Sequence, residues 1–364
     1  MLRRLLAPVA VAITALATAA ACTQGSPAAD TTTGSAAKDL SIAFLMPCST
    51  CADRFESKDK PYFEDAVKQL DPSIKVIANN AQGDASVQLQ QAESALTNGA
   101  KVIVVSPFTA ETGASIVAKA DAAGAKVVAY DGAIEGAVPA AYVSFQNEKV
   151  GELQGQYLLD KLPKGATVAM INGDITSAPG RDFKAGAHKI LDPAFADGRL
   201  KLGYESDTPS FDPAKGQAEM EQGLTKLNDK VQGVIAPNDG LANAVITALT
   251  ARKLNGRVLV TGQDATDPGL TAIIAGNQSM TVYKSIRDEA GAAAKIAVAL
   301  AKGDGAGAAS LTTTAVDNGT GQVPALLLDP VAVTKDNIAD VVIKDGYTTK
   351  DKICVGEAAA KCDL

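Results

Sequence analysis

The feature that most constrains the fold is a regular alternation of short apolar runs with helix-forming stretches, which begins near residue 40. The runs LSIAFLM, IKVIA, VIVVS and VVAY predict four strands, and helices are expected between them at 54–70, 85–98 and 111–123. Apolar runs this short and continuous are typical of strands buried on both faces of a parallel sheet. Two glycines stand where helices should end, and each is followed by Ala-Lys-Val and a strand.

The second half of the chain repeats this scheme, and the change falls near 143–147. The runs TVAMIN, KLGYES, VQGVIAP and RVLVTG predict strands, with helices between them at 181–190, 213–228 and 241–252. A strand SMTVYK, an Ala-rich helix at 285–302, a loop at 303–310 and a last strand-like run ALLLDPVAV follow. Two successive units of this kind predict an α/β protein with two doubly wound parallel-sheet lobes.

The first 38 residues have a different character. Arg3 and Arg4 precede an apolar run that ends in three alanines directly before Cys22. A basic head, an apolar core and a small-residue cleavage site indicate an export signal, and a cysteine at the cut point indicates a lipoprotein. We therefore expect a lipoprotein signal peptide at 1–21, lipidation of Cys22, and a flexible tether of small polar residues at 22–38. An ordinary signal or a membrane anchor remains the alternative.

Charge and histidine content narrow the function classes. The formal net charge is −7 and becomes more negative when the leader is removed, so nucleic acid is not an expected partner. The single histidine, His188, falls in a predicted helix. Zinc sites and Ser or Cys triads usually need histidine, so no metal and no catalytic triad are expected. The sequence contains no Gly-rich dinucleotide or P-loop motif, and no cofactor is predicted.

Four cysteines other than Cys22 form two close pairs. We expect Cys48 to bond with Cys51 and Cys354 with Cys362, although the sequence leaves crossed connections open. The Cys-Ser-Thr-Cys motif follows a strand and precedes a helix, which is also where a thioredoxin-like redox pair would lie. The large duplicated body favours a structural disulfide over a thiol–disulfide oxidoreductase.

Short polar residues follow several predicted strands in both halves. They are Asp131, Asn172, Asn238, Asp239, Gln263 and Asp264. In open parallel sheets ligands bind at the carboxyl ends of the strands, and carboxylates and amides suit the neighbouring hydroxyls of a sugar. Each of these residues can equally serve only as a helix N-cap. Their recurrence in both halves predicts a polar cleft between two sheets.

Four stretches carry a family resemblance, in this order: VVAYDGAIEGAVPAAYVSFQNEKVGELQG, APNDG, TGQDATDPGL and MTVYKSI. They resemble the xylose-binding group of periplasmic sugar-binding proteins, the substrate receptors of sugar ABC transporters. The resemblance covers about residues 39–346 and implies a type I periplasmic binding protein, with two lobes joined by a three-crossing hinge. The implied organisation is an N-terminal lobe of 39–144 plus 279–322, a C-terminal lobe of 145–278 plus 323–346, and a tail of 347–364 with a disulfide.

The resemblance also implies a ligand site of seven residues. They are Arg54, Phe55, Asp131, Phe211, Asn238, Asp264 and Lys284. The two phenylalanines are expected to hold the sugar ring between them, the two aspartates to accept hydrogen bonds from hydroxyls, and the other three residues to donate. The chain departs from the family at Gly132, where an arginine is usual, near Ala178-Pro179, where an asparagine is usual, and in having no tryptophan. These departures leave the identity of the sugar open.

The function that follows is that of an extracytoplasmic, lipid-anchored solute-binding protein, not an enzyme. It would capture a xylose-like pentose or related monosaccharide between its lobes and deliver it to the permease of an ABC transporter. Its partners would be the sugar, the permease and, through the lipid, the membrane, at the periplasm or cell surface, and the protein would be a monomer. A cyclitol or a signalling furanose is the alternative ligand, and the oxidoreductase is the remaining alternative function.

Overall fold

Parallel strands form a first sheet, as the continuous apolar runs predict. The computed structural model describes residues 40–364, and in that range seven strands pair in the order β11-β12-β5-β4-β3-β1-β2. The strands are β1 (Ser41–Met46), β2 (Lys75–Asn80), β3 (Val102–Val105), β4 (Lys126–Tyr130), β5 (Ala141–Phe145), β11 (Thr314–Asp317) and β12 (Gln322–Leu328). Only β11, at the edge, runs antiparallel to its neighbour. The signal peptide, the lipidation of Cys22 and the tether lie outside the described residues.

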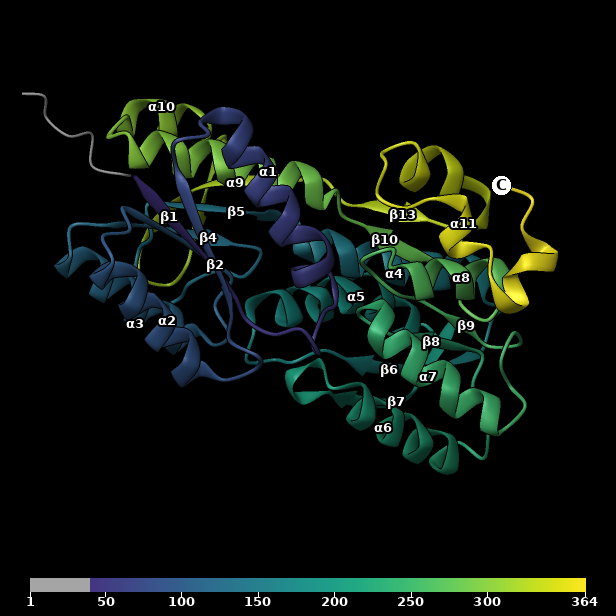
Figure 1. The fold of residues 1–364 in the computed structure, drawn as a ribbon. Helices are drawn as coiled ribbons and strands as arrows, with labels where there is room; N and C mark the ends of the chain where they lie inside the picture. Colours follow the sequence, from purple (N-terminus) through teal and green to yellow (C-terminus); the bar gives the residue numbers. More distant parts are fainter. Residues whose placement is uncertain (1–39) are drawn as a thin grey trace, which may run out of the picture. The chain divides into compact units, whose positions relative to one another are not determined.

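Helices cover both faces of this sheet (Figure 1). One face carries η1 (Phe55–Asp59), α1 (Lys60–Leu70), α9 (Ile286–Ala301) and α10 (Gly305–Ser310), and the other carries α2 (Ala85–Thr97) and α3 (Ala110–Ala122). Strand β1 shows why its sequence is continuously apolar. Phe44 packs with the α1 side and Leu45 with the α2 side, because successive side chains of a strand point to opposite faces. The loop predicted at 303–310 is wrong, since α10 occupies most of it.

The second sheet has the order β7-β6-β8-β9 and is entirely parallel in the described residues. Its strands are β6 (Ala166–Asn172), β7 (Leu200–Asp207), β8 (Gly233–Ile235) and β9 (Leu259–Val260). Helices α4 (Asn147–Lys161) and α5 (Ala178–Ala196) pack on one face, and α6 (Pro213–Lys226) and α7 (Asp239–Ala251) on the other. Helix α4 and helix α8 (Asp267–Ala275) are present in addition to the helices that the sequence pattern predicts.

The chain leaves or re-enters the first sheet and its helices at three points, and β10 (Thr281–Tyr283) and β13 (Val331–Val333) form a separate two-stranded sheet. The chain leaves β5 for α4, returns from β10 to α9, and leaves β12 for β13, which pairs antiparallel with β10. The run ALLLDPVAV, predicted as one strand, is therefore two strands of different sheets, because Pro330 cannot continue the ladder of β12. Residues 323–328, which were expected in the C-terminal lobe, belong to the first sheet, where 325–328 pair with β5 and 323–324 pair with β11.

The C-terminal tail is folded against the body of the protein. After η3 (Lys335–Asn337) and η4 (Ala339–Ile343), it forms α11 (Lys350–Ile353) and η5 (Gly356–Lys361). Ile353 and Ala358 are buried in the same apolar cluster as residues of α8. Both expected disulfides are present in the structure, Cys48–Cys51 and Cys354–Cys362. None of the helices in residues 40–364 is both long enough and apolar enough to cross a bilayer.

Candidate functional site

A cavity of about 100 Å³ gathers all seven predicted site residues. Its wall is built almost wholly from segments that directly follow strands. These are the segments after β1, β3 and β4 of the first sheet, after β6, β7, β8 and β9 of the second, and after β10. The carboxyl ends of parallel strands meet at one edge of a sheet, so two facing sheets bring these segments together. The volume is several times what a single water molecule needs.

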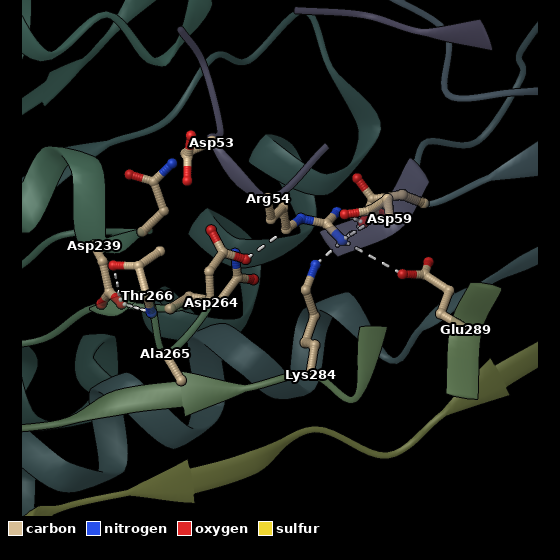
Figure 2. A network of polar contacts seen from close by, with 12 residues as sticks. Asp53, Arg54, Asp59, Asp239, Asp264, Ala265, Thr266, Lys284 and Glu289 are labelled. Atoms are coloured by element: carbon tan, nitrogen blue, oxygen red, sulfur yellow. Dashed lines mark hydrogen bonds and ion pairs between the residues drawn. The ribbon is translucent and has the colours of Figure 1, made fainter. Parts of the chain in front are cut away.

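Arg54 is the centre of the polar part of this cavity. It follows β1, its side chain is only 3% exposed, and its guanidinium approaches four carboxylates. The N–O distances are 2.6 Å to Asp131, 3.0 Å to Asp59, 3.5 Å to Glu289 and 3.7 Å to Asp264. Figure 2 shows the guanidinium reaching between Asp264 on one side and Asp59 and Glu289 on the other, with the Lys284 side chain pointing toward the same cluster. Burial by itself lowers the pKa of Arg54, but these carboxylates raise it well above its usual value.

Asp131 is held as an anion between two cations. Its Oδ1 lies 3.2 Å from Lys284 Nζ as well as 2.6 Å from Arg54. Burial alone would raise the pKa of Asp131, but Arg54 and Lys284 lower it to about 2. The backbone carbonyl of Asp131 accepts hydrogen bonds from the Tyr142 hydroxyl at 3.0 Å and from Ser144 Oγ at 2.7 Å. The carboxylate is therefore ionised at any physiological pH and held at a defined position.

Asp264 brings a second carboxylate to the cavity from the other sheet. Gln263 Nε2 donates to Asp264 Oδ1 at 3.0 Å, and the buried hydroxyl of Tyr347 donates to the Asp264 carbonyl at 3.1 Å. Asp264 has φ 94° and Asp131 has φ 59°, both in the left-handed region that non-glycine residues rarely adopt. Such conformations persist only where surrounding contacts enforce them, and they concentrate at functional sites.

Asn238 combines two roles that the sequence could not separate. It is the N-cap of α7, where its Oδ1 accepts from Leu241 N–H at 2.9 Å. Its Nδ2 also donates to the Cys51 carbonyl at 3.4 Å, so it joins a segment following β8 to one following β1. Asn172 and Asp239, two other strand-end candidates, do not line the cavity. Asp239 instead accepts hydrogen bonds from Gln278, Thr266 and Thr281, and burial raises its pKa to about 7.

The apolar wall of the cavity is larger than predicted. Phe55 and Phe211 line it as expected, and the guanidinium carbon of Arg54 lies 4.8 Å from the centre of the Phe55 ring. Phe108 and Phe183 line it too and were missed. Phe108 follows the run VIVVS, so its position after a predicted strand was a usable signal. Phe183 lies inside helix α5, where no sequence pattern distinguishes it from a core residue.

Two buried acids behind Arg54 were also missed. Asp59 Oδ1 accepts from the Tyr130 hydroxyl at 2.6 Å and from Arg54, and burial, opposed by Arg54, raises its pKa to about 6. Glu289 is fully buried, and its carboxylate oxygens have no hydrogen-bond partner within residues 40–364. Burial and the nearby Asp131 charge raise the pKa of Glu289 well above its usual value. Both acids lie in predicted helices, where a carboxylate is normally solvent-exposed.

The remaining wall of the cavity carries the departures from the family pattern. Gly132 and Pro179 both line it and offer no polar side chain there. Cys48 and Cys51 line it as a disulfide. No group of three or more His, Cys, Asp or Glu side chains in the described part of the chain is arranged to hold a metal ion.

Residues 42–305 of the chain match the family model described as the periplasmic binding protein domain. The chain belongs to the periplasmic binding protein family. It is 38% identical to the D-xylose-binding periplasmic protein of Haemophilus influenzae over 316 residues, which cover 87% of this chain and 92% of that protein. It is also 38% identical to the D-xylose-binding periplasmic protein of Escherichia coli over 296 residues, covering 81% and 88%.

Solved structures agree with this membership. A carbohydrate transporter solute-binding protein from Chloroflexus aurantiacus, solved in complex with D-glucose, superposes with a TM-score of 0.78 at 28% identity. The match covers 85% of this chain and 97% of that one. The prediction of a type I periplasmic binding protein with α/β architecture is confirmed. The chain is a binding protein and not an enzyme, and nothing among these relatives supports an oxidoreductase built on Cys48 and Cys51.

Proposed function

We propose that this protein is an extracytoplasmic solute-binding protein that captures a monosaccharide in the cavity around Arg54 and hands it, chemically unchanged, to the permease of an ABC transporter. The observation that carries this proposal is the convergence of five polar and two aromatic site residues from separate strand ends on one cavity. The relatives named for D-xylose and the neighbour solved with D-glucose support a sugar as the ligand.

The polar end of the cavity suits a neutral polyhydroxylated ligand. Asp131 and Asp264 provide buried carboxylate oxygens that accept from hydroxyl groups, while Arg54 and Lys284 provide donors. The charges already neutralise one another in part, so a charged ligand would leave an unpaired charge in a buried site. The phenylalanines offer apolar faces to the C–H groups of a sugar ring.

A compact sugar fits the cavity best. Gly132 and Pro179 leave its wall without hydrogen-bond partners at those positions, so a ligand that directs hydroxyl groups there would lose bonds to water without replacement. Such a loss costs about 1–3 kcal/mol for each unpaired group. We therefore place D-xylose and related pentoses first, and a cyclitol or a furanose second.

Ligand capture would involve closure of two lobes, with the first sheet at the core of one and the second at the core of the other. Asp131 belongs to the first and Asp264 to the second, so a ligand that contacts both has differential affinity for the closed arrangement. The mature protein would work as a monomer tethered through lipidated Cys22. The leader sequence supports this anchor, and metabolic labelling with a radioactive fatty acid, absent in Cys22→Ala, is the measurement that tests it.

Calorimetry of the processed protein against pentoses, hexoses, pentitols and cyclitols tests the ligand. We expect D-xylose or a close relative to bind with a single site per chain. The matched variants Asp131→Asn and Asp264→Asn should each weaken that binding at least tenfold, because each removes a charged hydrogen-bond acceptor worth about 1.5–3 kcal/mol. Absence of binding by every compound, in a protein whose circular dichroism shows it folded, would contradict the proposal.

A further inference from the structure

The segment between β1 and η1 forms part of the cavity wall, and its backbone makes few hydrogen bonds. Pro47, Cys48, Cys51 and Ala52 of this segment line the cavity directly before Arg54. Among the described residues, no backbone N–H from Cys48 to Asp53 donates to a backbone carbonyl. Two hydrogen bonds that involve side chains join residues 48–51 to other segments. One runs from Ser49 Oγ to Gln82 Oε1 at 3.1 Å, on the exposed side, and the other from Asn238 Nδ2 to the Cys51 carbonyl at 3.4 Å.

The Cys48–Cys51 disulfide takes the place of those missing contacts. It joins Cα atoms 5.8 Å apart within this segment, which is a usual separation for a disulfide. Cys48 is 1% exposed and anchored directly after β1, whereas Cys51 is half-buried at the cavity wall. The disulfide therefore links Cys51, three residues before Arg54, to Cys48, which lies close to the end of β1.

This segment also makes a contact to the other side of the cavity. The Cys51 carbonyl accepts the Asn238 Nδ2 hydrogen bond, and Asn238 follows β8 of the second sheet. The position of Cys51 therefore fixes the carbonyl that accepts the hydrogen bond from Asn238. It also fixes the direction of the backbone that leads to Arg54. Both Asn238 and Arg54 are residues of the proposed ligand site.

We infer that the Cys48–Cys51 disulfide is a positioning element of the ligand site, so that its reduction weakens sugar binding and bound sugar in turn resists its reduction. The inference rests on the proposed sugar-binding function. A dithiol reagent supplies the two electrons and two protons: the S–S bond breaks, two thiols form on Cys48 and Cys51, and the reagent closes to its own cyclic disulfide.

The bridge spans only three residue steps, so it constrains the unfolded chain far less than a long-range disulfide would. Its loss is therefore expected to change the site more than the fold. Linkage makes the coupling reciprocal: a given fold-change in sugar affinity on reduction equals the fold-change in the stability of the disulfide on sugar binding.

The test compares sugar affinity and disulfide potential in the same protein, with D-xylose as the probe, or the sugar that binds best in the panel. We expect Cys48→Ala/Cys51→Ala to weaken binding about tenfold while circular dichroism stays that of the wild type. We also expect saturating sugar to lower the reduction potential of Cys48–Cys51 by about 30 mV, the equivalent of that tenfold change. The Cys354–Cys362 disulfide, which does not line the cavity, is the internal control, and its potential should not respond to sugar.

Three outcomes would overturn the inference. The first is equal affinity of the oxidised protein and the double variant, with a potential that sugar does not move. The second is a loss of binding that accompanies a loss of the folded spectrum, because the bridge would then act on the fold. The third is a wild-type protein that binds no sugar of the panel in the oxidised state. Only this last outcome also removes the proposed function, so the two failures are distinguishable.

Discussion

The substitution Asp131→Asn tests how much the charge of this carboxylate contributes to the free energy of unfolding, measured without ligand. The pKa of Asp131 is about 2 in the folded protein, against about 3.9 in an unfolded chain. Each pKa unit corresponds to about 1.4 kcal/mol, so the ionised carboxylate stabilises the fold by about 2–3 kcal/mol at neutral pH. Asp131→Asn should lose that amount, since Arg54 and Lys284 then lose their shared anion.

The pH dependence gives the sign of the effect. A folded-state pKa below the unfolded value adds stability that is present above about pH 4 and is lost as the pH falls through about 2. Urea unfolding followed by circular dichroism should therefore show that the difference between wild type and Asp131→Asn shrinks over this window.

A matched control is Asp71→Asn. The pKa of Asp71 is also about 2, lowered by hydrogen bonds from Lys302 and Ser73, but this carboxylate is at the protein surface. Because solvent screens such pairs, Asp71→Asn should destabilise the protein much less than Asp131→Asn. Equal stability of Asp131→Asn and wild type at pH 7, or an unchanged difference at pH 2, would refute the assignment of Asp131 as a buried anion between two cations.

Three further predictions concern residues around the site. Glu289→Gln should gain stability relative to the wild type as the pH rises from 4 to 8, because the raised pKa of Glu289 makes its ionisation in the folded state costly above the unfolded pKa of about 4.3. A stability difference in urea unfolding that stays the same over this pH range would contradict this. Tyr347→Phe removes the hydrogen bond to the Asp264 carbonyl, so it should lower the stability by about 1 kcal/mol in unfolding experiments and weaken sugar binding in calorimetry. Full wild-type affinity would show that Tyr347 does not position Asp264 for the sugar. Gly151→Ala should destabilise the protein by about 1–3 kcal/mol in thermal unfolding, because a Cβ there would clash with the Phe183 carbonyl of the neighbouring helix α5. An unchanged melting temperature would show that α4 and α5 can move apart without cost.

The local sequence was sufficient to predict most of the first sheet and its helices. The run VIVV of β3 is apolar at every position because both faces of this strand are covered, and that pattern is visible without coordinates. The pattern was insufficient at ALLLDPVAV. There, β12 pairs with β5, about 180 positions away, and β13 pairs with β10, about 50 positions away, so the assignment of the two strands to different sheets depends on remote residues. Helix α8 was missed because its apolar sequence has no polar face to reveal a helical period.

The site shows the same division. Asp131, Asn238 and Asp264 follow apolar strands, so their place at a sheet edge could be predicted from the order of residues. The positions of Phe183 and Glu289 could not be predicted, because both residues lie within helices. They reach the cavity region only because of the way α5 and α9 pack. The spacing of the cysteines favoured the two local disulfides but left crossed connections open, and it gave no sign that Cys48–Cys51 lines the cavity while Cys354–Cys362 does not.

What the sequence by itself determined is the repeated α/β pattern, the strand ends that carry polar residues, and the family to which these motifs belong. These are properties of short segments, because the burial of both faces of a strand and the polarity of the residue after it can be inferred from a few consecutive residues. Only the tertiary structure decided that Arg54 approaches four carboxylates and that Asp131 is an anion while Glu289 favours its neutral form. Charge states in a buried cluster depend on distances between residues from remote segments and on the water excluded around them, and neither quantity exists before the chain is folded.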